Sequence, residues 1–190
     1  AMIKNLDDSI GEIKATLKEE GMLENTLIIF TSDNGCSPRA DFEELNAVGH
    51  KPGGIFRGNK ADIYEAGHRV PFIAHWPDGF SGGSSSGATI CLLDLFATLA
   101  DITDANTPSN VAEDSVSFLP ALNGTSKQVR EATVHHSING SFAIRKGDWK
   151  LVLCPGSGGW SSPTPNETKK MDLPPIQLFN LRSDPSETTN

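Results

Sequence analysis

Two neighbouring polar residues at the end of an apolar segment are the first indication of chemistry in this sequence. Residues 27–31 are aliphatic, aromatic and β-branched, and they lead into Asp33, Asn34 and Gly35. This pattern predicts a buried strand that ends in a tight turn, and ligands in open α/β sheets lie at the carboxyl ends of strands. Asp and Asn side chains offer hard oxygen donors that suit Ca²⁺ or Mg²⁺. The alternative is an ordinary turn whose polar side chains bond to their own backbone.

A second segment, residues 56–71, places basic residues beside glycines just before another apolar run. It closes a stretch, 35–69, with little periodicity, and a loop of that length in a compact domain is usually functional. The ammonium of Lys60 is a compact, rotatable cation that can hold an anionic oxygen. A divalent cation at Asp33 and Asn34 beside this lysine would neutralise a tetrahedral oxyanion during group transfer.

The elements that must position these segments predict an α/β arrangement in the first part of the chain. Apolar residues spaced by three and four predict an amphipathic helix over residues 3–17, with Gly21 at its carboxyl cap. A buried strand follows at 26–31, and a second apolar strand begins after Pro71. Residues 90–102 then predict a helix. Helix, link and buried strand form half of a βαβ unit.

The composition changes near residue 127, where we place a domain boundary. An Asn139-Gly140 turn between two apolar runs predicts a β-hairpin, and further runs extend it into an antiparallel sheet. The predicted strands are residues 133–138, 141–145, 149–153 and 177–181. Residues 154–175 are rich in Gly, Ser, Thr and Pro and are predicted to be irregular.

Composition excludes several classes of function. The chain has 190 residues and a formal net charge of −8, which argues against a nucleic-acid partner because such proteins carry a basic patch. No apolar run approaches the length of a transmembrane helix, so no membrane partner is predicted. The three cysteines, Cys36, Cys91 and Cys154, are widely spaced and form neither a metal motif nor a disulfide framework, although one disulfide would be possible.

Several motifs occur in order along the whole chain. Ser-Asp-Asn-Gly at 32–35 is followed by Gly-x-Lys-x-x-x-x-Glu-x-Gly-x-Arg-Val-Pro at 58–71. The later motifs are the apolar run 92–99, residues 143–151, and residues 178–187. Together they resemble the carboxyl-terminal half of type I sulfatases of the arylsulfatase type, in the alkaline-phosphatase-like superfamily. The resemblance implies part of an alkaline-phosphatase-like α/β sheet with flanking helices in residues 1–127, and a small antiparallel β subdomain in residues 128–190.

The resemblance also implies a role for the polar residues. Asp33 and Asn34 correspond to Ca²⁺ ligands, with Mg²⁺ as the alternative, and Lys60 corresponds to a catalytic lysine that contacts the sulfate oxygens. The implied reaction is hydrolysis of a sulfate ester, either of a sulfated glycan or of a small aryl sulfate.

Four further residues are candidate substrate contacts. His50 and Arg57 lie in the long loop, and His135 and His136 lie on a predicted strand near the implied substrate mouth. Because strand neighbours point to opposite faces, at most one of these two histidines can line a pocket. Arg69 is instead predicted to pair with a carboxylate.

The family's nucleophile is a cysteine converted to formylglycine in a Cys-x-Pro-x-Arg motif. Cys36-Ser37-Pro38-Arg39 places the arginine one position too early, so we interpret Cys36 as a loop cysteine. The resemblance therefore implies a carboxyl-terminal fragment, with the formylglycine and the other acidic ligands expected upstream. Such a fragment is expected to be inactive by itself and to self-associate through surface exposed by truncation.

Two other interpretations remain open. One is a fragment of a phosphodiesterase or phosphonate hydrolase of the same superfamily. Such enzymes also place a metal ion beside the group that stabilises the oxyanion. A formylglycine motif upstream would favour sulfate, and a metal pair bound by extra histidines would favour phosphate. The other is a structural lobe without turnover.

Overall fold

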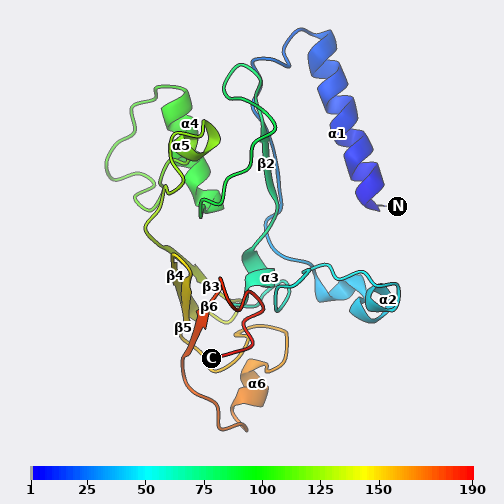
Figure 1. Ribbon diagram of the computed structural model, residues 1–190, viewed down its shortest axis with the longest axis vertical. Helices are drawn as coiled ribbons and strands as arrows, with labels where there is room; N and C mark the ends of the chain where they lie inside the picture. The colour runs from blue at the N-terminus through cyan, green and yellow to red at the C-terminus, as the bar shows by residue number, and fades with distance from the viewer. Residues whose placement is uncertain (1) are drawn as a thin grey trace. The chain divides into compact units, whose positions relative to one another are not determined.

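The predicted amino-terminal helix is α1 (Met2–Glu19) in a computed structural model that describes residues 2–190 (Figure 1). The helix ends at Gly21, which has a φ of +67° and donates its N–H to the carbonyl oxygen of Lys18 at 3.1 Å. Glycine adopts this left-handed conformation without a Cβ clash, so the predicted carboxyl cap is confirmed. None of the helix's residues is buried.

A two-stranded sheet follows, formed by β1 (Ile28–Thr31) and β2 (Phe72–His75). The strand before the Asp-Asn-Gly turn and the strand start after Pro71 are therefore confirmed. The sequence predicts a fully buried first strand, whereas every residue of β1 is only half-buried. The reason is that each strand of a two-stranded sheet is an edge with a single neighbour.

The predicted helix at 90–102 forms in two pieces, the 3₁₀ turn η2 (Leu92–Asp94) and α4 (Leu95–Ile102). Asp94 is fully buried at the junction, where its Oδ2 accepts the Cys91 N–H at 2.8 Å and its Oδ1 accepts the Val116 N–H at 2.9 Å. One carboxylate thus starts the helix and ties it to the segment that leads into α5 (Leu119–Leu122).

The stretch 35–69 is not structureless, which corrects the prediction of a long loop. It contains η1 (Pro38–Ala40), α2 (Phe42–Ala47) and α3 (Glu65–His68). Helix α2 begins at Asp41, whose Oδ1 accepts the Glu44 N–H at 3.1 Å. Such caps stabilise a single turn without the apolar repeat that identifies a longer helix.

The predicted meander is confirmed as an antiparallel sheet in the order β3-β4-β5-β6. Its strands are β3 (Thr133–His136), β4 (Phe142–Lys146), β5 (Trp149–Val152) and β6 (Gln177–Asn180). The predicted irregular stretch before β6 contains one short helix, α6 (Pro165–Thr168). Ile63 and Tyr64 are buried in one core cluster with residues of this sheet and the segments after it.

The chain divides into two compact units. The first unit is residues 1–30 with 72–129, and the second unit is residues 31–71 with 130–190. Residues 31–71 therefore pack with the antiparallel sheet, although 58 residues of sequence separate the two segments of the second unit. The division into sequence-continuous domains at residue 127 stays a prediction.

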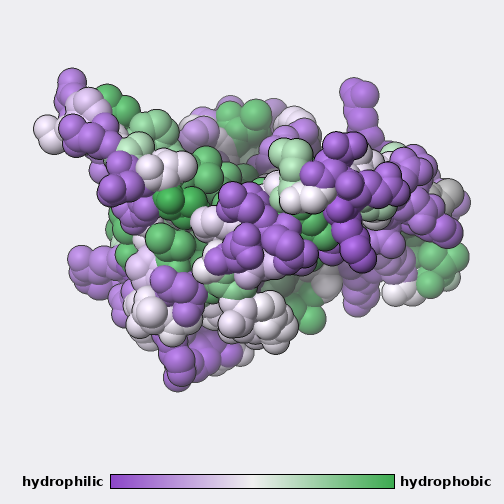
Figure 2. Space-filling model, turned by 90° about the horizontal axis from the view of Figure 1, so that it is seen from above, coloured by the Kyte–Doolittle hydropathy of each residue, from purple (hydrophilic) through white to green (hydrophobic). Residues whose placement is uncertain are grey.

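Large apolar side chains remain exposed on both units, among them Ile3, Val48 and Ile138. Figure 2 shows such apolar residues at the surface between hydrophilic ones. All three cysteines are free thiols. No helix within residues 2–190 combines the length and the apolar character needed to cross a bilayer.

Candidate functional site

The turn after β1 presents two oxygen donors. The side-chain N–H₂ of Asn34 donates to the Gly35 carbonyl oxygen at 3.0 Å, so the Asn34 Oδ1 faces away from this bond. The Asp33 side chain is exposed and forms no hydrogen bond or ion pair with the described residues. Asn34 therefore bonds to the backbone of its own turn, as in an ordinary turn, whereas Asp33 does not. The Asp33 carboxylate and the Asn34 Oδ1 are oxygen donors of the kind that a cation such as Ca²⁺ takes.

Gly35 allows the turn to pack against helix α3. Its N–H donates to the Gly67 carbonyl oxygen at 3.0 Å, and a Cβ at this position would lie 1.7 Å from the Ala66 carbonyl oxygen. No side chain fits in that space, so a glycine is required here. The two backbones are therefore in direct contact just after Asp33 and Asn34.

Residues 58–62, the Lys60 loop, are fastened to the same turn. The Lys60 N–H donates to the Cys36 carbonyl oxygen at 2.9 Å. Ala61 has a φ of +84°, a conformation that costs a residue with a Cβ of order 1 kcal/mol and that concentrates at functional sites. The half-buried Lys60 side chain has no hydrogen-bond or ion-pair partner among residues 2–190. The main-chain hydrogen bond thus fastens the Lys60 backbone to the residue that follows the Asp33-Asn34-Gly35 turn.

Asp62 fixes the shape of the Lys60 loop from within. Its buried carboxylate accepts the Asn59 N–H at 2.8 Å through Oδ2. Its Oδ1 accepts the N–H groups of Trp160 and Ser161 at 2.8 and 3.0 Å, and the Ser161 hydroxyl also donates to Oδ2. One carboxylate therefore joins the Lys60 loop to the Gly-rich segment after β5.

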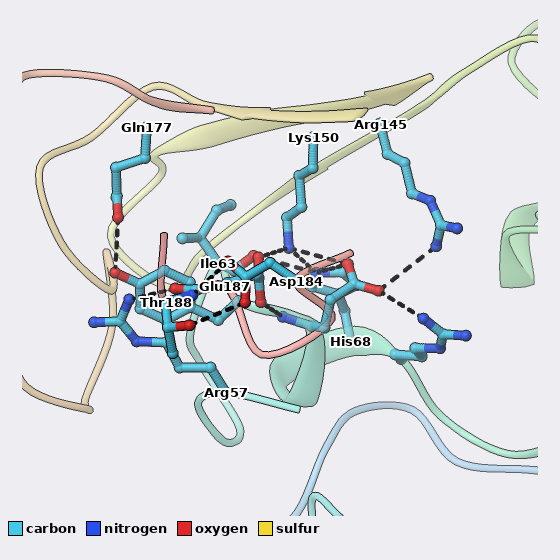
Figure 3. A network of polar contacts seen from close by, with 12 residues as sticks. Arg57, Ile63, His68, Arg145, Lys150, Gln177, Asp184, Glu187 and Thr188 are labelled. Atoms are coloured by element: carbon cyan, nitrogen blue, oxygen red, sulfur yellow. Dashed lines mark hydrogen bonds and ion pairs between the residues drawn. The ribbon is translucent and has the colours of Figure 1, made fainter. Parts of the chain in front are cut away.

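A buried ion network joins α3 to β5 and to the segment after β6 (Figure 3). Lys150 on β5 is 0% exposed, and its ammonium lies 3.1 Å from Glu65 Oε1 and 2.7 Å from Glu187 Oε1. The Glu65 N–H donates to Glu187 Oε2 at 2.6 Å. Burial raises the pKa of Glu65, but the Lys150 ammonium and the other nearby cations outweigh burial, so that pKa is lowered and the carboxylate stays charged.

Two arginines complete the ion network at the other oxygen of Glu65. Arg69 and Arg145 lie 3.2 and 3.5 Å from Glu65 Oε2. The predicted pairing of Arg69 with a carboxylate is therefore confirmed.

His68 and His135 lie against this network as a pair of rings in contact, with centroids 3.7 Å apart and planes tilted by 46°. Lys150 Nζ and the Ile63 carbonyl oxygen each lie 3.2 Å from His68 Nε2. Burial and the Lys150 charge lower the pKa of His68 to about 3 and that of His135 to about 4. Both rings are therefore uncharged packing groups at neutral pH.

The predicted substrate contacts lie in different surroundings. The Arg57 guanidinium packs 4.0 Å from the Tyr64 ring centroid and donates to the Glu187 carbonyl oxygen at 2.8 Å. His136 is exposed, next to the Phe142 ring at 5.9 Å. His50 is exposed and its ring has no partner among residues 2–190.

Sequence reasoning missed the supporting residues Asp62, Lys150 and Glu187. Lys150 alternates with apolar residues along β5, which is typical of a solvent-facing position, yet it is buried. The Asp-Pro-Ser-Glu segment that ends at Glu187 has the composition of a polar tail. The sequence signal that could have indicated their importance is that Lys150 and Glu187 each lie in one of the motifs that occur in order along the chain.

The comparison with known proteins decides the family. The model of the sulfatase family matches residues 1–105. The chain belongs to the sulfatase family. The predicted resemblance is thereby confirmed. The α/β fold with its antiparallel sheet is also confirmed, because a solved structure superposes on 97% of this chain.

Individual sulfatases show how much of the family this chain represents. It is 39% identical to an N-acetylgalactosamine-6-O-sulfatase of Bacteroides thetaiotaomicron, over 100% of this chain and 37% of the relative. A solved structure from work on glycosaminoglycan metabolism by the same organism matches with a TM-score of 0.81 and 38% identity, over 97% of this chain and 38% of that one. A second solved structure, in complex with its substrate D-glucosamine-2-N,6-O-disulfate, matches with a TM-score of 0.70 and 25% identity. This match covers 99% of this chain and 34% of the other chain. The chain thus spans less than two-fifths of each of these proteins.

Proposed function

We propose that this chain supplies the cation- and sulfate-binding residues of a sulfatase that hydrolyses sulfate esters. The observation that carries the proposal is the hydrogen bond of 2.9 Å from the Lys60 N–H to the Cys36 carbonyl oxygen, which fastens the lysine to the turn with Asp33 and Asn34. Lys60 would hold a sulfate oxygen and lower the energy of the charge that develops there. The ester would belong to a sulfated glycan or a small aryl sulfate.

The oxygen donors of the turn are of a type that suits Ca²⁺, with Mg²⁺ as the alternative. The turn offers fewer of them than Ca²⁺ requires. Asp33 and Asn34 offer one carboxylate and one amide oxygen, whereas Ca²⁺ takes about six to eight oxygen ligands. Within residues 2–190, no three His, Cys, Asp or Glu side chains gather closely enough to hold a metal. When bound, the cation would supply positive charge beside the sulfate. We therefore assign Asp33 and Asn34 as part of a larger ligand set.

Among the candidate substrate contacts we favour His50 and His136. Both rings are exposed, and although His136 contacts the Ser137 carbonyl oxygen through Nδ1 at 2.9 Å, its Nε2 has no partner among residues 2–190. Arg57 and His135 are already packed against Tyr64 and His68, and we propose that they position the site instead.

Calcium binding tests the assignment of the turn. We expect isothermal titration calorimetry of the chain to give a dissociation constant near the weak end of the protein range, about 10⁻⁴ to 10⁻³ M, because water must replace the missing ligands. Asp33→Ala should abolish the heat, and Asp172→Ala, which removes another exposed carboxylate of the second unit, should leave it unchanged. Micromolar binding would mean that the ligand set is complete within these residues and would contradict a shared site.

The isolated chain is expected to hydrolyse neither aryl sulfates nor aryl phosphates above background. The reason is that its sequence contains no Cys-x-Pro-x-Arg motif to provide the family's formylglycine nucleophile. Release of nitrophenol from the nitrophenyl esters is the measurement. Turnover that disappears in Cys36→Ala would show that the Cys36 thiol is reactive after all.

A further inference from the structure

An exposed tryptophan stands on the Gly-rich segment that Asp62 fastens to the Lys60 loop. Residues 156–159 of this segment are buried, whereas Trp160 is 51% exposed. Its indole has no ring or cation–π contact with the described residues. The backbone of the segment is thus packed firmly while its one large apolar side chain faces solvent.

The backbone under Trp160 is in direct contact with the Lys60 loop. A Cβ on Gly159 would lie 2.5 Å from the Ala61 carbonyl oxygen, so glycine is needed to let the two backbones meet. The Trp160 N–H donates to Asp62 Oδ1 at 2.8 Å. Trp160 is therefore one residue from a backbone contact with Ala61, and Ala61 is the neighbour of Lys60.

An exposed polar residue, Asn139, is bonded to the backbone two residues before Trp160. The Asn139 N–H donates to the Gly158 carbonyl oxygen at 3.4 Å, and the exposed Asn139 side chain uses its Oδ1 for the Ser137 hydroxyl. Its side-chain N–H₂ is left to donate outward. An exposed indole and exposed amide donors on two hydrogen-bonded segments match the two kinds of surface on a sugar ring, which has an apolar C–H face and hydroxyl groups at its edge.

We propose that Trp160 is a specificity-determining residue that packs against the sugar ring of a sulfated carbohydrate while Lys60 holds the sulfate. This inference rests on the proposed function and adds a substrate class to it. An aryl sulfate would use the indole but not the amide donors, so the arrangement favours a sugar. The sulfated amino sugar bound by the relative described above belongs to the same chemical class.

The test is nuclear magnetic resonance of the three tryptophan indole N–H groups in the ¹⁵N-labelled chain. Trp→Phe variants assign the signals of Trp76, Trp149 and Trp160. Trp149 is the matched control, because it is 53% exposed in the same unit but lies at the β4–β5 turn. The ligands are N-acetylgalactosamine 6-sulfate, N-acetylgalactosamine, phenyl sulfate and inorganic sulfate.

We expect the sulfated sugar to shift the Trp160 signal at millimolar concentration and to leave the Trp149 signal in place. The unsulfated sugar and inorganic sulfate should shift it less. Trp160→Ala should weaken the binding of the sulfated sugar, followed at the Ala61 amide, by about two- to tenfold, as expected for loss of one aromatic contact.

Three results would overturn the inference: no Trp160 shift with the sulfated sugar, an equal shift at Trp149, or an equal response to phenyl sulfate. Lys60→Ala separates this inference from the proposed function. In Lys60→Ala, the sulfated sugar could still bind at Trp160 and still bind more tightly than the unsulfated sugar. That result would mean that Lys60 does not hold the sulfate, while the contact between Trp160 and the sugar would stand.

Discussion

Replacing Lys150 with methionine is expected to lower the free energy of unfolding of the second unit by about 3–5 kcal/mol. The Lys150 ammonium is fully buried between Glu65 and Glu187, at 3.1 and 2.7 Å. Methionine fills similar space but removes the ammonium that both carboxylates share, and Glu187 is then left buried without an ion-pair partner, which carries a large desolvation penalty. Urea denaturation followed by circular dichroism measures the change.

The control for this experiment is Lys146→Met, which removes a lysine whose side chain is 67% exposed on the neighbouring strand. It should leave the transition midpoint unchanged within error. Adding Glu187→Gln to Lys150→Met should restore part of the lost stability, because the unpaired charge is then gone while Glu65 keeps its ion pairs with Arg69 and Arg145. A loss below about 1 kcal/mol in Lys150→Met would contradict a central role for the ion network, since that is the range of a surface pair.

In a full-length sulfatase that contains this chain, Lys60→Ala is expected to lower kcat by about 10² to 10³, the usual effect of removing one oxyanion partner. The Lys60 ammonium has no hydrogen-bond or ion-pair partner within residues 2–190, so its removal breaks no polar interaction of the fold. The stability of the variant should therefore be normal. Steady-state hydrolysis of an aryl sulfate, with the melting temperature measured alongside, separates the two effects.

The control is Lys170→Ala, which removes one positive charge from an exposed position after α6. This variant should keep full activity. Asp33→Ala in the same full-length protein should abolish turnover by removing a cation ligand. If Lys60→Ala retains more than about a tenth of the wild-type kcat, less than the loss of one oxyanion donor predicts, Lys60 does not stabilise the developing charge.

The elements that local sequence determines could be predicted. Gly21 was recognisable as a carboxyl cap, and Asn139-Gly140 as a hairpin turn, because each depends on the conformational preference of a few adjacent residues. The same holds for the turn after β1. Helix α2 was missed because its stability comes from the Asp41 cap rather than from an apolar repeat.

The support of the candidate site depends on contacts between residues that are far apart in sequence. Lys150 and Glu65 are separated by 85 residues, and Asp62 and Trp160 by 98. Periodicity describes neighbours within one element, so it cannot indicate that a lysine on a strand will be buried by carboxylates from two other segments. The motifs showed which residues belong together, and the structure showed how they are held.

The bond between the Glu65 N–H and the Glu187 carboxylate has a consequence for synthesis, because its partners are 122 residues apart. At about 5–20 residues per second, a ribosome needs about 6–24 s to pass from one to the other. Throughout that time α3 lacks the carboxylate that receives its N–H, and for the first 85 of those residues it also lacks the lysine that neutralises Glu65. The first unit's later segment emerges in between and can fold earlier. The growing chain thus carries an unfinished, charge-bearing surface for many seconds, which is the interval in which chaperones and proteases compete for it.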